Sequence, residues 1–266
     1  MQPMASIALK AAHRAGHLIL KASEDHDRIK VDTKSENDFV SEVDKAAEAE
    51  VLYHLKKTYP THGFLCEEGG LIEGREDGTD YLWVIDPLDG TTNFIRGIPH
   101  YAVSIACYHQ GRLEHGVIYD PCRDESFVAS RGRGVQMNGR RLRVNSRANM
   151  DGALIGTGIP FKGRHDDKLP AYANCMSDIA GSCAGIRRAG AASLDLAYVA
   201  AGRLDAFWEI GLSRWDIAAG VLMIKEAGGL VSDFNGADKY EESGNIVAGS
   251  PKCFKAVLKA VHEHLG

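Results

Sequence analysis

Apolar residues recur at helical spacing in two segments of the N-terminal half of the chain. In Met4 to Ala22 and in Asp44 to Thr58 they return every turn, which places them along one face of a helix. The residues between these segments, 23–41, are charged and lack this period, so we expect a mobile loop there. A further helix is expected between Asp216 and Gly228, and its small residues at 218–220 indicate close backbone packing near its start.

Short apolar runs with β-branched members predict strands. The run Leu82–Ile85 is typical of a buried strand, and we expect it to end at Asp86 because Pro87 cannot donate a ladder hydrogen bond. Residues 69–80 are polar and predict a second loop. Three later runs are expected to form an antiparallel meander: Tyr101 to Tyr108, Leu113 to Tyr119 and Ser126 to Ala129. This mixture of helices and strands predicts α+β layers. No repeat or flexible linker divides the chain, so we expect residues 1–266 to form one domain or two close lobes.

The loop after the first strand carries the strongest chemical signal. Asp86 and Asp89 leave the strand three residues apart, and Gly90 allows an unusual backbone angle that brings a ligand close. Thr91 and Thr92 then offer N–H groups and hydroxyls to an anion at the start of a short helical turn. Mg²⁺ prefers oxygen ligands and commonly shares them with a substrate phosphate. The loop therefore predicts a metal-phosphate site, although Asp-Pro and Asp-Gly pairs also occur in ordinary capped turns.

Acids elsewhere in the chain could belong to the same site. Glu67 and Glu68 end another apolar run, and because adjacent strand residues face opposite sides, only one of them can point into a given site. Asp216 lies in the first turn of an expected helix, where it either caps the helix or holds a cation. For Glu67 and Glu68, exposed loop acids remain the alternative.

Composition excludes several classes of function. The chain has 266 residues with 31 basic and 36 acidic side chains, and the net charge of −5 argues against a protein that coats nucleic acid. Met1 to Ala22 has neither the apolar core of a signal peptide nor the length of a membrane span. The six cysteines show no C-x-x-C spacing, which favours free thiols in a cytoplasmic protein.

One basic cluster, residues 131–147, departs from this acidic balance. Asn138-Gly139 at its centre is a strong hairpin signal, so an exposed hairpin that carries arginines is the first interpretation. The alternative is an RNA-binding strip, but no aromatic residues interleave with the arginines to stack on bases. Direct binding of nucleic acid is therefore not expected.

Two of these segments match known motifs. Asp86-Pro-Leu-Asp-Gly-Thr-Thr-Asn-Phe94 and Trp215-Asp-Ile-Ala-Ala-Gly220 resemble the two signature motifs of the inositol monophosphatase family. The resemblance extends over nearly the whole chain and is strongest to the bacterial SuhB-type branch, through Leu194 to Gly202 and Phe207 to Leu212. It implies an α-β-α-β-α sandwich, commonly a homodimer.

The resemblance also implies roles for individual residues. Side chains of Glu67, Asp86, Asp89 and Asp216, with the main-chain carbonyl of Leu88, would hold about two to three Mg²⁺ ions. Thr91 and Asp44 would hydrogen-bond to each other beside the attacking water, although Asp44 could instead only cap the helix that begins there. The implied catalytic residues are thus Glu67, Thr91 and Asp44. The implied substrate-binding residues are Asp89, Gly90, Thr91, Gly190, Ala191, Ala192, Glu209 and Asp216, of which Glu209 would contact inositol hydroxyls.

The implied activity is Mg²⁺-dependent, lithium-sensitive hydrolysis of myo-inositol monophosphate. Direct attack by water fits the chain better than a covalent intermediate, because it has neither a Walker-type phosphate loop nor a Gly-x-Ser-x-Gly elbow. Alternative substrates are fructose 1,6-bisphosphate, histidinol phosphate and 3′-phosphoadenosine 5′-phosphate. SuhB-type proteins also suggest a different role, as partners of a protein in ribosomal-RNA transcription antitermination complexes.

Overall fold

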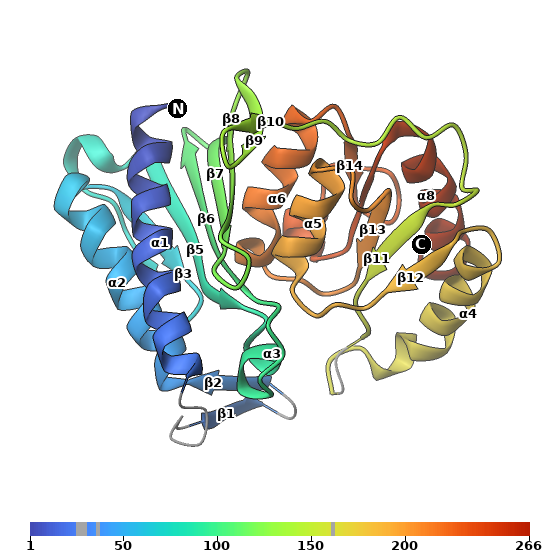
Figure 1. Cartoon of the computed structure of the whole chain (residues 1–266), viewed down its shortest axis with the longest axis horizontal. Helices are drawn as coiled ribbons and strands as arrows, with labels where there is room; N and C mark the ends of the chain where they lie inside the picture. The colour runs from blue at the N-terminus through green and yellow to red at the C-terminus, as the bar shows by residue number, and fades with distance from the viewer. Residues whose placement is uncertain (25–30, 36–37, 161–162) are drawn as a thin grey trace.

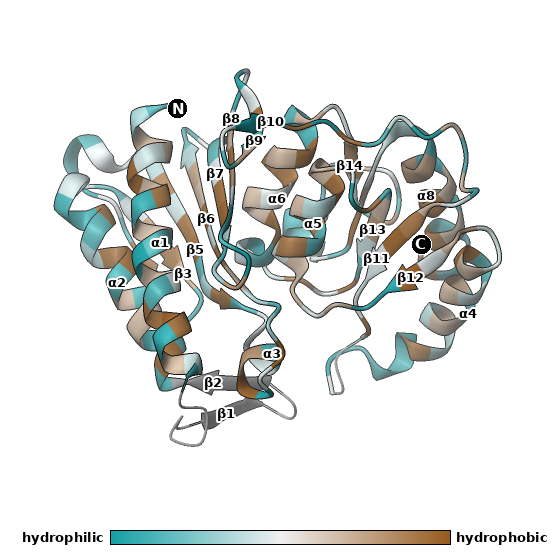
Figure 2. Ribbon diagram, viewed as in Figure 1, coloured by the Kyte–Doolittle hydropathy of each residue, from teal (hydrophilic) through white to brown (hydrophobic). Residues whose placement is uncertain are grey.

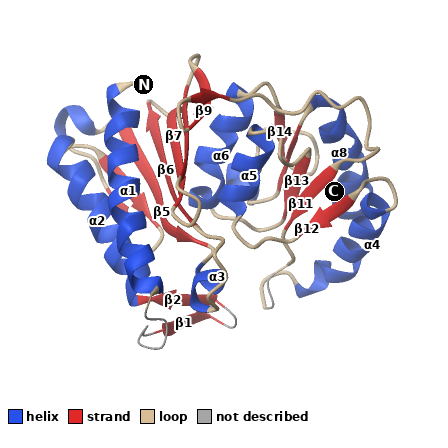
Figure 3. Cartoon of the chain, in the orientation of Figure 1, coloured by secondary structure: helices blue, strands red, loops and turns tan. Residues whose placement is uncertain are grey.

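The computed structural model describes residues 1–24, 31–35, 38–160 and 163–266. Its elements stack in five layers, α-β-α-β-α, as the resemblance implied (Figures 1 and 3). The outer helices at the N-terminal end are α1 (Pro3–Ser23) and α2 (Glu42–Thr58). The middle layer holds α5 (Ala192–Ala200) and α6 (Arg214–Glu226), and the far layer holds α4 (Leu169–Ala180) and α8 (Pro251–Leu265). The predicted helices at 4–22, 44–58 and 216–228 are thus confirmed, with small shifts of their ends.

Two mixed sheets separate these helix layers. The eight-stranded sheet has the order β10-β9-β8-β7-β6-β5-β3-β4, and the five-stranded sheet has the order β12-β11-β13-β15-β14. The strands of the first sheet are β3 (Gly63–Cys66), β4 (Gly70–Ile72), β5 (Tyr81–Asp89), β6 (Ala102–His109), β7 (Arg112–Asp120), β8 (Glu125–Ser130), β9 (Gly134–Met137) and β10 (Arg140–Arg141). Those of the second are β11 (Leu154–Thr157), β12 (Gly185–Arg187), β13 (Ala206–Glu209), β14 (Leu230–Ser232) and β15 (Ile246–Gly249). Strands β6 to β8 form the predicted antiparallel meander, and β5 pairs antiparallel beside β6.

The middle helix layer is packed closely because its residues are small. A Cβ atom added to Gly220 of α6 would lie 2.4 Å from the Cβ of Leu196 on α5. One added to Gly116 of β7 would lie 3.0 Å from the carbonyl oxygen of Ala219. Helix α6 is buried from Ile217 to Ile224, so it is covered from both sides. The predicted close packing at the start of this helix is confirmed. By contrast, α1 and α2 alternate apolar and polar residues, as expected of helices with one buried face (Figure 2).

Some predictions for loops and strand ends were wrong. Strand β5 does not end at Asp86: its pairing with β6 shifts register after Asp86 and resumes where Asp89 faces Ala102. Pro87 has no N–H to donate, so the hydrogen bonds between β5 and β6 are interrupted there but resume after it. Residues 69–80 contain β4 and a short 3-10 turn at Glu76–Gly78 rather than a plain loop.

The segment 23–41, predicted as a mobile loop, also contains regular structure. Strands β1 (Val31–Ser35) and β2 (Asp38–Ser41) pair antiparallel. Residues 25–30 and 36–37 lie outside the described residues. The sequence did not indicate these strands, because residues 31–41 are largely polar and carry no apolar alternation.

Other predictions from composition can be compared with the structure. All six cysteines are free thiols. Asn138 and Gly139 both adopt positive φ angles, 47° and 81°, between β9 and β10, which confirms the predicted hairpin. Among the described residues, no helix is both long and apolar enough to cross a membrane.

Candidate active site

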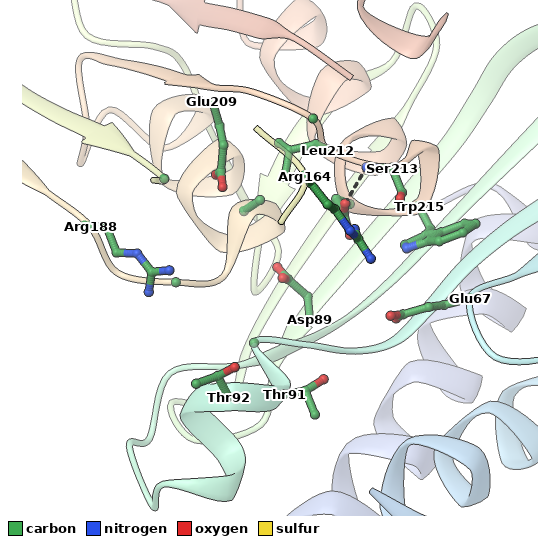
Figure 4. A pocket seen from close by; sticks show the side chains of 16 residues that line it. Glu67, Asp89, Thr91, Thr92, Arg164, Arg188, Glu209, Leu212, Ser213 and Trp215 are labelled. Carbon is green, nitrogen blue, oxygen red and sulfur yellow. Dashed lines mark hydrogen bonds between the residues drawn. The ribbon is translucent and has the colours of Figure 1, made fainter. Parts of the chain in front are cut away.

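A polar pocket of about 300 Å³ lies where the first sheet, the β12–α5 loop and the start of α6 meet (Figure 4). It is lined by Glu67, Asp89, Gly90, Thr91, Thr92, Gly158, Arg164, Arg188, Gly190, Ala192, Glu209, Gly211, Leu212, Ser213, Trp215 and Asp216. Residues from distant parts of the sequence therefore converge on one cavity. Three of the carboxylates predicted to hold Mg²⁺, those of Glu67, Asp89 and Asp216, line it directly.

Parallel pairing of β3 with β5 brings the first acids together. Cys66 is the partner of Ile85, and the N–H of Glu67 donates to the carbonyl of Ile85 at 3.2 Å. Glu67 and Asp86 therefore leave the same edge of the sheet on adjacent strands. Glu67 lines the pocket and Glu68 does not, so only one acid of the pair faces it, as predicted.

Gly90 makes the turn from β5 into the short helix α3 (Thr91–Ile95). Its φ of 92° lies in the left-handed region, and a Cβ there would come within 3.0 Å of the carbonyl oxygen of His100. A side chain at this position would be strained and crowded. The glycine therefore allows Asp89 and Thr91 to flank the pocket from either side of the turn.

Thr91 and Asp44 meet, although they are 47 residues apart in sequence. The Thr91 hydroxyl donates to Asp44 Oδ1 at 2.9 Å and lies 3.0 Å from the carbonyl oxygen of Leu88. Asp44, in the first turn of α2, is fully buried. The hydrogen bond expected from the resemblance is thus present, and Thr91 presents its oxygen to the pocket between two acceptors.

Two of the carboxylates are held by backbone and hydroxyl donors. Asp89 Oδ2 accepts hydrogen bonds from the N–H of Ser193, at 2.7 Å, and from its hydroxyl. Asp216 Oδ2 accepts from the N–H of Ser213 at 2.6 Å, so Asp216 does cap helix α6. Because that bond uses one oxygen of Asp216, capping and a role in the pocket are compatible.

Burial and mutual repulsion raise the pKa values of these acids. Burial first, and then the charges of Glu67, Asp89 and Asp216, raise the pKa of Asp86 well above its usual range. Burial raises the pKa of Asp89 to about 6, although the hydrogen bonds from Ser193 oppose this shift. Burial, followed by the charges of Asp89 and Glu67, raises the pKa of Asp216 well above its ordinary value. The three aspartates so placed are destabilised as anions unless a cation neutralises them.

The acid cluster suits a hard divalent cation. Carboxylate oxygens are the ligands that Mg²⁺ prefers, and its positive charge would offset the repulsion. Within the described ranges, no three His, Cys, Asp or Glu side chains form a closed metal-binding group as they stand. Mg²⁺ does not require one, because it is usually bound by one or two carboxylates together with water and substrate phosphate.

The other half of the pocket contains Glu209 and Arg188. Glu209, at the end of β13, is 7% exposed, and burial raises its pKa well above the usual range while Arg188 opposes that shift. A Cβ on Gly158 would lie 1.8 Å from Glu209 Oε1, so only glycine leaves room for this carboxyl. Figure 4 shows Arg188 on the opposite side of the pocket from Glu67, with Asp89 between them.

The remaining predicted residues divide into two groups. Gly190 and Ala192 line the pocket, but Ala191 does not: its side chain is 1% exposed and lies behind Gly90. The expectation that Ala191 lines the pocket was therefore wrong, because the residue precedes the first turn of α5 and faces the protein interior. Asp44, Asp86 and Leu88 also lie behind the lining.

Several residues of the site were not predicted from the sequence. Arg164 and Arg188 line the pocket, and Ser193 holds Asp89. The side-chain amide of Asn93, on α3, donates to the carbonyls of His100, at 2.8 Å, and Ala189, at 2.9 Å. Asn93 therefore connects α3 to the loop that carries Arg188. Asn93 is a polar residue within the Asp86–Phe94 motif, and this position could have indicated its role. In the sequence, nothing indicates that Arg188 rather than its neighbour Arg187 lines the pocket.

Strand β6 connects two parts of the acid cluster, Asp86 on β5 and Asp216 at the start of α6. Ser104 is the register partner of Asp86, and its hydroxyl donates to the carbonyl of Trp215 at 3.3 Å. Trp215 immediately precedes Asp216. This buried serine therefore links the strand that carries Asp86 to the helix turn that carries Asp216.

Comparisons with known proteins agree with this arrangement. A model described as "Inositol monophosphatase family" matches residues 1–265. The chain is 61% identical over 265 residues to "Nus factor SuhB" of Pseudomonas aeruginosa, an alignment that covers 100% of this chain and 98% of that protein. It superposes on the extragenic suppressor protein suhB of Bartonella henselae with a TM-score of 0.93 and 40% identity, covering 98% of each chain. It superposes on the inositol monophosphatase of Anabaena with a TM-score of 0.84 and 34% identity, covering 97% and 95% of the two chains.

Proposed function

Because this chain belongs to the inositol monophosphatase family, we propose that it is a Mg²⁺-dependent phosphatase that hydrolyses myo-inositol monophosphate to myo-inositol and phosphate. The observation that carries this proposal is the convergence of Glu67, Asp89 and Asp216 on one polar pocket, with Asp86 directly behind. Such a cluster of carboxylates can bind cations, and these cations can in turn contact a phosphate dianion. Phosphoryl transfer depends mainly on positioning and charge neutralisation, and this pocket is equipped for both.

The residues that would hold Mg²⁺ are Glu67, Asp86, Asp89, Asp216 and the carbonyl of Leu88. When bound, the ion supplies positive charge to the phosphate and makes water a better nucleophile. Ser193 and Ser213 hold Asp89 and Asp216 in place by the hydrogen bonds described above.

Thr91 and Asp44 would orient and deprotonate the attacking water. Thr91 Oγ1 accepts a proton from water while its own proton moves along the hydrogen bond to Asp44 Oδ1. The water oxygen bonds to phosphorus, the bond from phosphorus to the polyol oxygen breaks, and that oxygen takes a proton from solvent. Glu209, in the half of the pocket away from Glu67, is placed to accept hydrogen bonds from polyol hydroxyls.

Phosphate release from a panel of sugar, inositol and nucleotide phosphates, with and without Mg²⁺, tests this proposal. We expect inositol monophosphate to be hydrolysed, the activity to disappear with a chelator, and Li⁺ to inhibit non-competitively or uncompetitively. Asp89→Asn should lower kcat by about 100-fold or more, because it removes several kcal/mol of charge stabilisation while keeping the shape. The exposed Asp238→Asn is the matched control. Wild-type turnover in Asp89→Asn would exclude the site assignment.

A second candidate role is accessory protein of ribosomal-RNA transcription antitermination. It is favoured by the relative at 61% identity, which is named a Nus factor. We expect tagged protein to copurify transcription elongation factors equally well as wild type and as Asp89→Asn, since that role would not need catalysis. Absence of such factors from both samples would reject this role. The expected homodimer and cytoplasmic location remain predictions, and light scattering would test the first.

A further inference from the structure

Glu48 is a buried acid beside the candidate metal site for which the proposed reaction has no role. It lies on α2 and is 5% exposed, yet it does not line the pocket. A glutamate is almost never buried to this extent unless other groups pair with it. The groups that Glu48 contacts therefore indicate what it does.

Glu48 is hydrogen-bonded to the turn that carries Glu67. Residues 67–69 form the three-residue turn between β3 and β4. Within this turn, the N–H of Glu68 donates to Glu48 Oε2 at 2.9 Å. A carboxylate accepts a hydrogen bond more strongly than a neutral carbonyl does. Helix α2 thus binds the turn at the residue that directly follows Glu67.

The second oxygen of Glu48 packs against the same turn. A Cβ added to Gly69 would lie 2.8 Å from Glu48 Oε1, so the absence of a side chain at Gly69 leaves the space that this carboxyl group needs. Both oxygens of Glu48 therefore meet the turn, Oε2 at the N–H of Glu68 and Oε1 beside Gly69.

Glu67 is the residue that these contacts fix. Its own N–H donates to the carbonyl of Ile85 at 3.2 Å, and the N–H of the next residue donates to Glu48. The peptide groups on both sides of Glu67 are therefore held, while its side chain extends into the pocket (Figure 4). Groups that hold a metal ligand in place contribute to metal affinity although they do not touch the metal.

The same face of α2 holds a second part of the site. Asp44 and Glu48 are four residues apart, so they lie one turn apart on one side of the helix, and both are buried. Asp44 accepts a hydrogen bond from Thr91, and Glu48 accepts one from Glu68. One helix face thus holds both the turn after β3 and the turn after β5.

We propose that Glu48 is a positioning residue: by holding the turn between β3 and β4, it keeps Glu67 in the geometry that binds Mg²⁺. This inference rests on the proposed phosphatase function, in which Glu67 is a metal ligand. Glu48 acts as a hydrogen-bond acceptor and does not touch the ion. Its removal should therefore weaken Mg²⁺ binding but leave the chemical step largely intact once Mg²⁺ is saturating.

Calorimetric titration with Mg²⁺ tests the inference. Glu48→Ala removes the acceptor, whereas Gly69→Ala keeps it but adds a Cβ that displaces either the carboxyl group or the turn. Both should weaken Mg²⁺ affinity about tenfold or more, as removal of a group that holds a metal ligand usually does. Glu48→Gln keeps a neutral acceptor, whose hydrogen bond is about half as strong, so it should lose about threefold. Glu50→Gln is the matched control, because Glu50 contacts His54 on the same helix, and it should match wild type.

Two further measurements distinguish positioning from a general loss of stability. In the metal-free protein, hydrogen exchange of the Glu68 amide should be faster in Glu48→Ala and unchanged in Glu50→Gln. In phosphate-release assays, Glu48→Ala should require more Mg²⁺ than wild type and regain its kcat when Mg²⁺ is saturating. Gly69→Ala leaves the buried acid in place, so it decides the inference if Glu48→Ala does not fold.

Three results would overturn the inference. Unchanged Mg²⁺ affinity in Glu48→Ala, despite faster exchange of the Glu68 amide, would mean that Glu67 does not depend on this hydrogen bond. A loss in Glu48→Gln as large as in Glu48→Ala would mean that the charge of Glu48 acts on the ion. A kcat that saturating Mg²⁺ does not restore would place Glu48 in the chemical step. If wild type binds Mg²⁺ but hydrolyses no phosphate ester, the proposed function fails, and the comparison of affinities still decides the inference.

Discussion

Replacement of Thr91 by alanine tests whether the pair formed with Asp44 acts on the chemical step. The change removes a hydroxyl that donates to Asp44 Oδ1 at 2.9 Å and lies 3.0 Å from the carbonyl of Leu88. Because Asp44 is fully buried, loss of this donor should reduce the free energy of unfolding by about 1–3 kcal/mol. For a chain of this size the expected fall in Tm is about 2–12 °C, so the variant should still be folded at 25 °C.

The kinetic effect should be larger than the effect on binding. Positioned proton transfer contributes about 100-fold or more, so kcat of Thr91→Ala should fall by about two orders of magnitude, or about 2.7 kcal/mol, with KM changed little. Thr91→Ser keeps the hydroxyl and is the matched control, with an expected loss of less than about threefold. Asp44→Asn keeps the shape and removes the negative charge, so it should impair the same proton transfer.

The double variant distinguishes a shared role from two separate roles. If each single change lowers kcat about 100-fold and both act on one water, the double variant should also lose about 100-fold. Independent roles predict a product of about 10,000-fold. Steady-state phosphate release at saturating Mg²⁺ measures kcat for wild type, the three single variants and the double variant. A multiplicative loss, or a Thr91→Ser variant as slow as Thr91→Ala, would refute the dyad and leave Asp44 as a helix-capping residue.

Three further changes test other parts of the structure. Ser104→Ala removes the hydrogen bond to the Trp215 carbonyl, and we expect a several-fold weaker Mg²⁺ affinity by calorimetry; unchanged affinity would show that Ser104 does not set the spacing of the acids. Gly158→Ala places a Cβ 1.8 Å from Glu209 Oε1, so it should raise KM for inositol monophosphate while leaving Mg²⁺ affinity intact, and an unchanged KM would mean that Glu209 does not contact the substrate. Burial raises the pKa of the Cys66 thiol to about 12, so iodoacetamide at pH 8 should alkylate it only after unfolding; rapid labelling of the native protein, judged by peptide mass spectrometry, would contradict this.

The parts of the fold that could be predicted are those whose residues carry a regular pattern. Helices α1 and α2 and the meander β6–β8 each bury one set of residues at a fixed period, so the sequence alone indicates them. Strands β1 and β2 have no such pattern. Strand β5 continues past Pro87 because β6 remains paired beside it as far as Asp89. Residues 81–89 alone do not show where this pairing with β6 ends.

The candidate site divides in the same way. Local motifs indicated Asp86, Asp89 and Asp216, because their residue types and spacing carry the chemistry. The contact of Thr91 with Asp44 was expected only from the family resemblance, since 47 residues separate them. Arg188 could not be distinguished from Arg187, because which of two adjacent arginines faces the pocket depends on how the loop is tied to Asn93.

The two halves of the pocket come from different layers of the fold, and this has a consequence for specificity. The acid cluster is built mainly on β3, β5 and the first turn of α6, whereas Arg188 and Glu209 belong to the second sheet and the loop that leaves it. Among the described residues, hydrogen bonds from Ser193 to Asp89 and from Asn93 to the carbonyls of Ala189 and Gly190 join the two halves. Changes in the distal half can therefore alter which substrate is held without moving the carboxylates. Substitutions at Ser193 or Asn93 should instead disturb both halves, because they change the distance between them.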